Sequence, residues 1–424
     1  MSDKSGPGAI EAAGMRPVEE ILRENGIEAH RVERPGSEEE VGNILSKACR
    51  DRMRVLPLGG GTSLGVALLP QKIDLVLDMR GMHAISELDP KNLNMTVEAG
   101  KTIDAINREL AGVQRGFMLP LDPPMSHWAT IGGCYAANMS GPLRQLYGTL
   151  RDQALGVRAV NVEGRKVGFG GMTVKNVSGY DLTKFLIGSA GSLCVVTKIS
   201  LRILPVPDAS ALCGLIFPRD SDLEGFLKEL RRSVLIPSAV VARWKAGDDS
   251  RRVDVGFEGY PKAVDRQVRD VQEMAAHHGG SGEAIMGREG MREELRRAMD
   301  VGDGPGDRSL RLKMSVPISR GLEAAEGIEA LASQGRLEAQ VALLAGNGVL
   351  FLCARDESME VLKEFSKGVR GIAVRLGGHV TPVRGPREVL EAWGARMDPV
   401  LERNVVRPIK EAWDPVGVLL PVTP

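Results

Sequence analysis

A glycine-rich stretch, VLPLGGGTSLG, follows an apolar segment and runs from Val55 to Gly65. Glycine leaves backbone N–H groups open to a ligand, and consecutive N–H groups form a nest for anions. The phosphate loop of nucleoside triphosphatases requires a lysine after its last glycine, but Gly61 is followed by Thr62. The GxGxxG dinucleotide fingerprint fails too, because Leu64 stands at its last position. The stretch is therefore either another kind of anion nest or a tight turn.

Two further segments combine glycines with small or polar residues. From Leu119 to Asp152, a rigid proline-rich start leads through Thr130–Gly133 into a helix of small residues. Glycines at a helix start give a ligand access to N–H groups, although close helix–sheet packing also demands small residues. From Gly170 to Pro205, a polar cluster is followed by the turn sequence GSAGSL. All three segments are candidates for binding one anionic ligand.

Six histidines are scattered along the chain, and one of them, near its end, could do acid–base chemistry with an arginine close by in the sequence. His379 lies in LGGHVTPVRG, five residues before Arg384. An arginine can bind the carboxylate of a hydroxy acid while a histidine accepts its hydroxyl proton. The alternative is a histidine at a strand end that faces solvent. His379 and Arg384 are the catalytic candidates that the sequence offers.

Composition excludes several classes of function. The 55 Lys and Arg residues balance 55 Asp and Glu residues, and aromatics are only 4%, so no nucleic-acid surface is expected. The five cysteines form no CxxC pair, so we expect neither a metal site nor an iron–sulfur cluster on this chain. No secretory leader and no apolar run of about 18 residues is evident. These features predict a cytoplasmic protein without an integral membrane segment.

The order of strand and helix patterns predicts an α+β fold in four parts. Residues 1–28 read as a tail and a short helix, and residues 29–205 as a domain that carries all three segments. Pro205 and Pro207 mark a boundary. Residues 206–385 alternate strand and helix, which predicts an antiparallel sheet with helices on one face. Residues 386–424 begin as helix and end extended.

Together the three segments resemble the flavin domain of the vanillyl-alcohol oxidase family, also called the p-cresol methylhydroxylase (PCMH) type. PLGGGTSL resembles its pyrophosphate loop, and LDPP…ATIGG…AANMSGPLRQLYG its second flavin segment. The third segment, VKNVSGYDLTKFLIGSAGSL, follows in the same order, and the resemblance covers about Val32 to Pro205. SGPLRQLYG and KNVSGYDLTKFLIGS are most similar to the smaller flavoprotein subunit, the GlcE type, of bacterial glycolate oxidases.

This resemblance implies FAD as the cofactor. Members that attach the flavin covalently through the first loop carry a histidine there, where this chain has Thr62, so non-covalent FAD is expected. The resemblance also places Lys175, Asn176 and Tyr180 near the isoalloxazine. The remaining implied contacts are Pro57, Gly59, Gly60, Gly61, Thr62, Ser63, Leu64, Pro120, Leu121, Asp122, Pro123, Thr130, Ile131, Gly132, Gly133, Ala137, Ser140, Gly141, Gly191 and Val196.

The resemblance also bears on substrate and partners. Residues 206–385 resemble the family's cap, and the C-terminal segment resembles the one that returns to the flavin domain. Catalytic subunits that oxidise D-2-hydroxy acids carry HAGDGNLH in the cap, where this chain has LLAGNGVLFL, with Leu344 and Phe351 in place of both histidines. The resemblance therefore implies an FAD subunit beside a larger catalytic flavoprotein and an iron–sulfur subunit, with contact to the inner membrane through partners. A self-sufficient D-2-hydroxy-acid dehydrogenase and a flavin-free scaffold are the alternatives.

Overall fold

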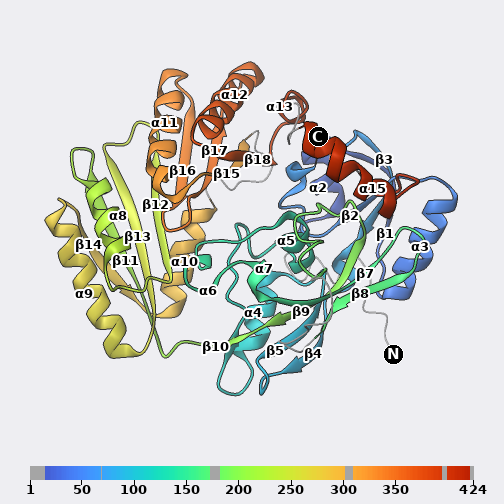
Figure 1. Cartoon of the computed structure of the whole chain (residues 1–424), viewed down its shortest axis with the longest axis horizontal. Coiled ribbons are helices and arrows are strands. Elements are labelled where there is room, and N and C mark those ends of the chain that lie inside the picture. The colour runs from blue at the N-terminus through green and yellow to red at the C-terminus, as the bar shows by residue number, and fades with distance from the viewer. Residues whose placement is uncertain (1–14, 68, 172–181, 301–308, 394–398, 421–424) are drawn as a thin grey trace. The chain divides into compact units, whose positions relative to one another are not determined.

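The computed structural model describes residues 15–67, 69–171, 182–300, 309–393 and 399–420. The chain divides into two compact units, and both combine helices with sheets, which confirms the predicted α+β class (Figure 1). Among these residues, no helix is both long and apolar enough to cross a bilayer. The first unit comprises Met1–Ser140, Thr149–Pro205 and Gly394–Pro424, and the second comprises Gly141–Gly148 and Val206–Trp393.

A three-stranded parallel sheet, in the order β1-β3-β2, opens the first unit. Its central strand is buried, as expected for a parallel sheet covered on both faces. Helix α3 (Glu38–Arg50) begins after Ser37, because the Ser37 side chain accepts a hydrogen bond from the Glu40 N–H and acidic residues fill the first turn. The strands are β1 (Glu28–Glu33), β2 (Val55–Leu58) and β3 (Lys72–Asp78), with α2 (Val18–Glu24) before them.

A five-stranded antiparallel sheet, in the order β4-β5-β9-β7-β8, completes the first unit. Strands β7 and β8 form a hairpin whose turn contains Glu163 and Gly164. The strands are β4 (Ile85–Asp89), β5 (Asn94–Glu98), β7 (Ala154–Val160), β8 (Lys166–Gly170) and β9 (Val195–Arg202). The helices are α4 (Ile103–Ala111), α5 (Ile131–Ala137) and α7 (Leu150–Gln153), and β6 (Phe117–Met118) pairs with β10 (Leu204–Pro205).

The second unit is built on one eight-stranded antiparallel sheet, in the order β14-β11-β13-β12-β16-β17-β15-β18 (Figure 1). Its first strands are β11 (Ala209–Pro218), β12 (Ala239–Lys245), β13 (Ser250–Gly259) and β14 (Ser281–Met286). The others are β15 (Leu310–Ser315), β16 (Glu338–Leu344), β17 (Val349–Arg355) and β18 (His379–Arg384).

The two faces of this sheet differ in chemistry. Alternate apolar residues of every strand from β11 to β17 except the edge strand β14 pack under four helices to form a large hydrophobic core. These helices are α8 (Leu223–Arg232), α9 (Pro261–His277), α11 (Gly321–Gln334) and α12 (Met359–Arg375). The opposite face bears charged residues such as Asp254, Arg311 and Lys313, and we call it the polar face, although apolar residues such as Leu344 and Phe351 are also buried on it. It carries α6 (Arg144–Tyr147) and α10 (Arg288–Met299), so helices lie on both faces rather than on one.

The C-terminal segment is helical and then extended. Helix α13 (Arg387–Glu391) closes the second unit, whereas the segment from Pro399 returns to the first unit. There, Val418, Leu419 and Leu420 are buried against β2 and its neighbours. The helical turns are α14 (Pro399–Leu401), the π-helical turn η4 (Glu402–Val406) and α15 (Arg407–Trp413).

Candidate functional site

The glycine loop after β2 lies tightly between two other segments of the first unit. A Cβ atom at Gly60 would overlap the carbonyl oxygen of Trp128, so only glycine fits there without backbone movement. Gly61 has a φ of 70°, and a Cβ there would lie 2.5 Å from Cγ2 of Ile21 in α2. These contacts explain why consecutive glycines are needed. A Cβ at Gly59 would lie 2.1 Å from Oγ1 of Thr130, so the loop also lies against the start of α5.

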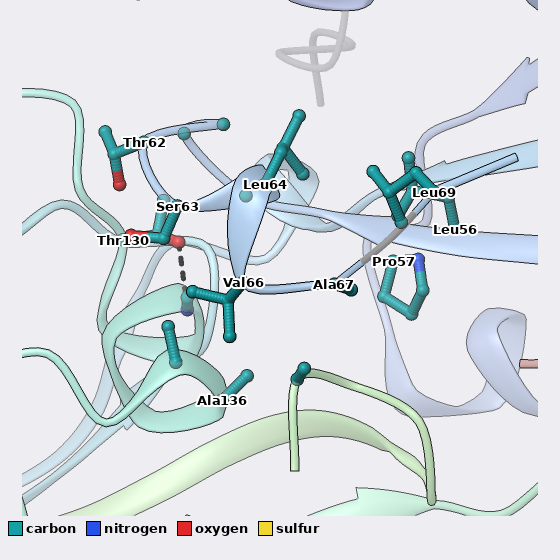
Figure 2. Close-up of a pocket in the computed structure, with 16 residues that line it drawn as sticks. Leu56, Pro57, Thr62, Ser63, Leu64, Val66, Ala67, Leu69, Thr130 and Ala136 are labelled. Atoms are coloured by element: carbon teal, nitrogen blue, oxygen red, sulfur yellow. Dashed lines mark hydrogen bonds between the residues drawn. The ribbon is translucent and has the colours of Figure 1, made fainter. Parts of the chain in front are cut away.

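A pocket opens along this loop, and Figure 2 shows it between the loop and helix α5. Ten of the predicted cofactor contacts line it, which brings together the first two segments of the sequence. They are Pro57, Gly59, Gly60, Gly61, Thr62, Ser63, Leu64, Thr130, Gly133 and Ala137. The sequence analysis missed Leu56, Val66, Ala67 and Leu69, whose apolar types gave no chemical signal, whereas Ala136 and Ala190 lie in segments that it singled out.

The polar groups of the pocket come mainly from the backbone of the loop. The N–H groups of Gly60, Gly61, Thr62 and Ser63 donate no hydrogen bond to any acceptor among the described residues. Unpartnered successive N–H groups are what an anion nest offers, and the hydroxyls of Thr62 and Ser63 add two donors. A pyrophosphate group fits this donor set, because it is an anion with several acceptor oxygens.

Helix α5 contributes differently from the expectation. The N–H of Ile131 donates to the Lys101 carbonyl, the N–H of Gly132 to the Ala99 carbonyl, and the N–H of Gly133 to the Thr130 side chain, at 2.9, 2.9 and 3.3 Å. The dashed line in Figure 2 marks the last of these bonds. The first N–H groups of α5 are therefore used within the protein, and the helix supplies small-residue surface rather than free donors.

The third sequence segment joins the pocket through a turn at residues 188–191. The N–H of Gly188 donates to the Tyr135 carbonyl at 3.1 Å, and the N–H of Ala190 to the Ala136 carbonyl at 2.8 Å. Gly191 follows with a φ of 72°, and a Cβ there would lie 3.8 Å from Pro57. The turn thus lies against the end of α5, and Ala190 lines the pocket.

A lysine of the C-terminal segment ties this turn to the strand that carries the glycine loop. Lys410 Nζ donates to the carbonyls of Ser192 at 2.7 Å and Leu419 at 2.8 Å, and it pairs with Asp414 at 2.5 Å. Asp414 in turn accepts from the N–H groups of Val418 and Leu419 at 2.9 and 2.8 Å. The N–H of Val55, at the start of β2, also donates to the Val418 carbonyl. Lys410, Asp414 and residues 418–419, which we call the C-terminal latch, therefore connect the turn at residues 188–191 to the strand that leads into the glycine loop.

Other predicted cofactor contacts lie beyond the pocket lining. Residues 120–123 are an irregular segment after β6, Ile131 is fully buried, and Val196 pairs with β7. The buried Ser140 hydroxyl accepts a hydrogen bond from the Leu150 N–H at 3.4 Å, which gives it a structural role. Gly141 belongs to the second unit. Lys175, Asn176 and Tyr180 lie outside the described residues.

The polar face of the second sheet carries the two catalytic candidates. Arg384 pairs with Arg311 across the β15–β18 ladder, and both are only 8% exposed. His379 pairs with Ser315 and is exposed. The two pairs are four residues apart along β15, or about 13 Å at the usual rise of a strand. The structure therefore places both candidates in one ladder but does not bring them into contact.

Lys313 lies between these two pairs and was missed in the sequence analysis. It shares a face with Arg311 and Ser315, while Leu310, Leu312 and Met314 point into the core. Burial and the nearby Arg144 of α6 lower the pKa of Lys313 from 10.5 to about 8. The signal was present in the sequence as the alternation of RLKMS, in which every second residue is polar.

The two positions that lack the cap histidines share a sheet face with Lys313. Phe351 of β17 pairs directly with Lys313, and Leu344 of β16 pairs with Val349, whose other partner is Ser315. Both side chains are buried. Histidines at these positions would share a sheet face with Lys313, whereas the actual residues are apolar and cannot accept a proton or bind a metal.

The similarity of this chain to known proteins agrees with the pocket. Residues 29–170 match a family model described as FAD binding domain. The chain contains an FAD binding domain. The match includes the glycine loop, α5 and β7, and it is of the PCMH type. FAD is accordingly the cofactor, as predicted, and the loop donors fit its pyrophosphate.

Curated relatives share part of this chain. It is 31% identical to D-lactate dehydrogenase [cytochrome] from Arabidopsis thaliana over 58% of the chain and 45% of that protein. It is 38% identical to glycolate oxidase subunit GlcE from Escherichia coli over 38% of the chain and 45% of that protein. The chain thus spans less than half the length of these relatives.

A solved structure shows the same fold over most of the chain. The 4-ethylphenol oxidase from Gulosibacter chungangensis superimposes with a TM-score of 0.71 and covers 93% of this chain and 89% of its own. The sequence identity is 16%, so this likeness establishes the fold alone. The fold of both units is therefore that of the family proposed from the sequence.

Proposed function

We propose that this chain is the FAD-carrying subunit of an oxidoreductase complex that oxidises a small 2-hydroxy acid of the glycolate or D-lactate type. Its partners would be a larger catalytic flavoprotein and an iron–sulfur subunit, with the complex in the cytoplasm. The observation that carries the proposal is the pair Leu344 and Phe351, which place apolar groups where the cap of catalytic relatives has histidines. The similarity to the GlcE subunit supports the same assignment.

The pocket of the first unit would hold the cofactor. The N–H groups of Gly60 to Ser63 would bind the pyrophosphate, and the C-terminal latch at Lys410 would keep the third segment against the loop. Bound FAD supplies a two-electron acceptor for a hydride. Thr62 offers no imidazole for a covalent bond, so the flavin is held without one. Acid precipitation should leave the yellow colour in the supernatant, and a yellow pellet would contradict this.

A second candidate function is a self-sufficient 2-hydroxy-acid dehydrogenase, favoured by the cationic groups near Lys313. Arg311 and Arg384 face each other across the β15–β18 ladder next to Lys313, and the charge of Arg144 in α6 lowers the pKa of Lys313. Guanidinium groups and the charged ammonium of Lys313 bind the carboxylate of a 2-hydroxy acid. His379 lies at the exposed end of the same ladder.

One experiment separates the two candidates. The FAD-loaded chain is mixed with glycolate or D-lactate and an artificial acceptor dye. The subunit proposal predicts turnover well below about 1 s⁻¹, the low end for enzymes in general, until the catalytic flavoprotein is added. Turnover in the ordinary range by the chain alone would overturn it in favour of the second candidate. Lys313→Met should raise the KM of that turnover and leave the flavin content unchanged.

A further inference from the structure

Two charge networks lie along helix α10, on the polar face of the second sheet. The network near its middle is satisfied internally. Arg243 Nε and Arg252 Nε each donate to Asp254 at 2.8 Å, and Arg252 Nη2 donates to Glu294 at 3.2 Å. Two guanidinium groups thus meet two carboxylates. This network serves as an internal reference for the other one.

The second network lies at the first turn of α10. Glu258 of β13 is 8% exposed and accepts a hydrogen bond from the Tyr147 hydroxyl at 2.9 Å. Arg288 and Arg292, one turn apart on α10, exert their positive charge on this pair. Burial and Arg292 lower the pKa of Arg288 to about 10. The half-buried guanidinium of Arg288 therefore lies near a second cation, Arg292, and the buried Glu258 is the carboxylate that these two arginines share with Tyr147.

Arg288 differs from the arginines of the reference network in its hydrogen bonds. Its Nε and Nη2 atoms are both buried and have no partner among the described residues. These two nitrogens form one edge of the guanidinium, and their N–H groups point in parallel, as a carboxylate requires for two simultaneous hydrogen bonds. Burying charged donors without a partner is costly. The unmet edge of Arg288 therefore has the geometry of a carboxylate receptor.

The start of α10 also has room to adjust. Gly287 precedes Arg288 with a φ of 97°, and no atom lies within 4 Å of the position of a Cβ there. Its N–H donates to the Ser210 carbonyl at 2.7 Å, which anchors the turn to β11. Arg288 as a whole is partly exposed, so part of the residue reaches solvent while its Nε and Nη2 edge is buried.

We propose that Arg288 binds a small carboxylate anion at the first turn of α10, through Nε and Nη2, with Arg292 adding positive charge. The site is formed by residues of the second unit alone, namely those of α10, β13 and α6. It shares no residue with the FAD pocket or with the Lys313 ladder. The proposal is thus independent of the proposed redox function. The expected ligand of the Arg288 site is a small monocarboxylate from solution.

The test is calorimetric titration of the FAD-loaded full chain with sodium acetate and sodium glycolate, against sodium chloride at equal ionic strength. We expect saturable binding of both carboxylates, and at least tenfold weaker binding in Arg288→Gln. Arg297→Gln is the matched control, because Arg297 is on the same helix but is 59% exposed and pairs with Glu293 and Glu294. It should bind like the unmodified chain.

Several results would overturn the proposal. They are equal heats for acetate and chloride, unchanged binding in Arg288→Gln, or saturable binding of inorganic phosphate without binding of acetate. Lys313→Met separates this site from the sheet ladder, because acetate binding at Arg288 should survive that change. If Arg288→Gln does not fold, Arg288→Lys keeps the charge but lacks the two-donor edge. Its acetate affinity should fall, and the Nε–H resonance that it removes should shift with acetate in the unmodified chain.

Discussion

The FAD pocket and the polar face of the second sheet bind charge in opposite ways. The pocket offers backbone N–H groups on a loop whose glycines are enforced by contacts with Trp128 and Ile21. The sheet face offers long side chains, chiefly Lys313, Arg311 and Arg384, on a rigid ladder. Backbone donors are fixed once the loop is folded, whereas side-chain donors depend on protonation and on neighbours. The two regions should therefore respond differently to substitution and to pH.

The largest effect is expected from adding one methyl group to the pocket. In Gly60→Ala the new Cβ would overlap the Trp128 carbonyl oxygen, so the loop backbone must move and its N–H groups lose their alignment. We expect FAD affinity to fall by about a hundredfold, or roughly 2.7 kcal/mol. Bound flavin absorbance after gel filtration measures this. The control is Gly371→Ala on α12, where the Cβ meets open space, and equal flavin loss in both would contradict the prediction.

A loss of stability is expected from breaking the C-terminal latch. Lys410→Met leaves buried Asp414 and the carbonyls of Ser192 and Leu419 without their ammonium partner. We expect the free energy of unfolding to fall by about 2–4 kcal/mol, as for other half-buried ion pairs that lose one member.

Urea unfolding measures this change in stability. Lys367→Met is the control, because its partner Glu364 is 2.6 Å away and both side chains are more than 60% exposed. That pair should contribute little to stability, because water screens exposed charges. If both variants lose the same stability, the latch has no special role in holding the pocket together.

A smaller effect is expected from removing the charge on the sheet face. Lys313→Met should raise the KM for a 2-hydroxy acid by about tenfold, because one cation for the substrate carboxylate is lost. The flavin content should not change, since Lys313 and the pocket belong to different units. Steady-state kinetics with glycolate, in whichever assembly turns over, measures this. A variant with normal KM would remove Lys313 from the substrate site.

The smallest effect is a pH dependence of the same KM. The pKa of Lys313 is lowered to about 8 by burial and by Arg144, so its charge is present below pH 8 and is lost above it. Carboxylate binding should therefore weaken by a few-fold between about pH 7 and pH 9, while FAD affinity stays constant. Lys313→Arg should flatten the profile, because arginine stays charged. A flat profile in the unmodified chain would contradict the lowered pKa.

The sequence by itself determined the cofactor loop and the fold class. The tests for a phosphate loop and for GxGxxG fail at Thr62 and Leu64, and the three segments in order indicated an FAD domain. Such signals are local, because glycine marks a backbone position where a side chain would clash. The absence of cap histidines was equally visible, since residue type needs no coordinates.

Only the tertiary structure decided which groups act together. The first N–H groups of α5 bond to Ala99, Lys101 and Thr130, so the expected helix donors are not free. His379 and Arg384, five residues apart in sequence, are separated along a strand, and Lys313 stands between their partners. Lys410 reaches Ser192 across more than two hundred residues. Strand register and long-range contacts set these neighbourhoods, and neither is written in local residue spacing.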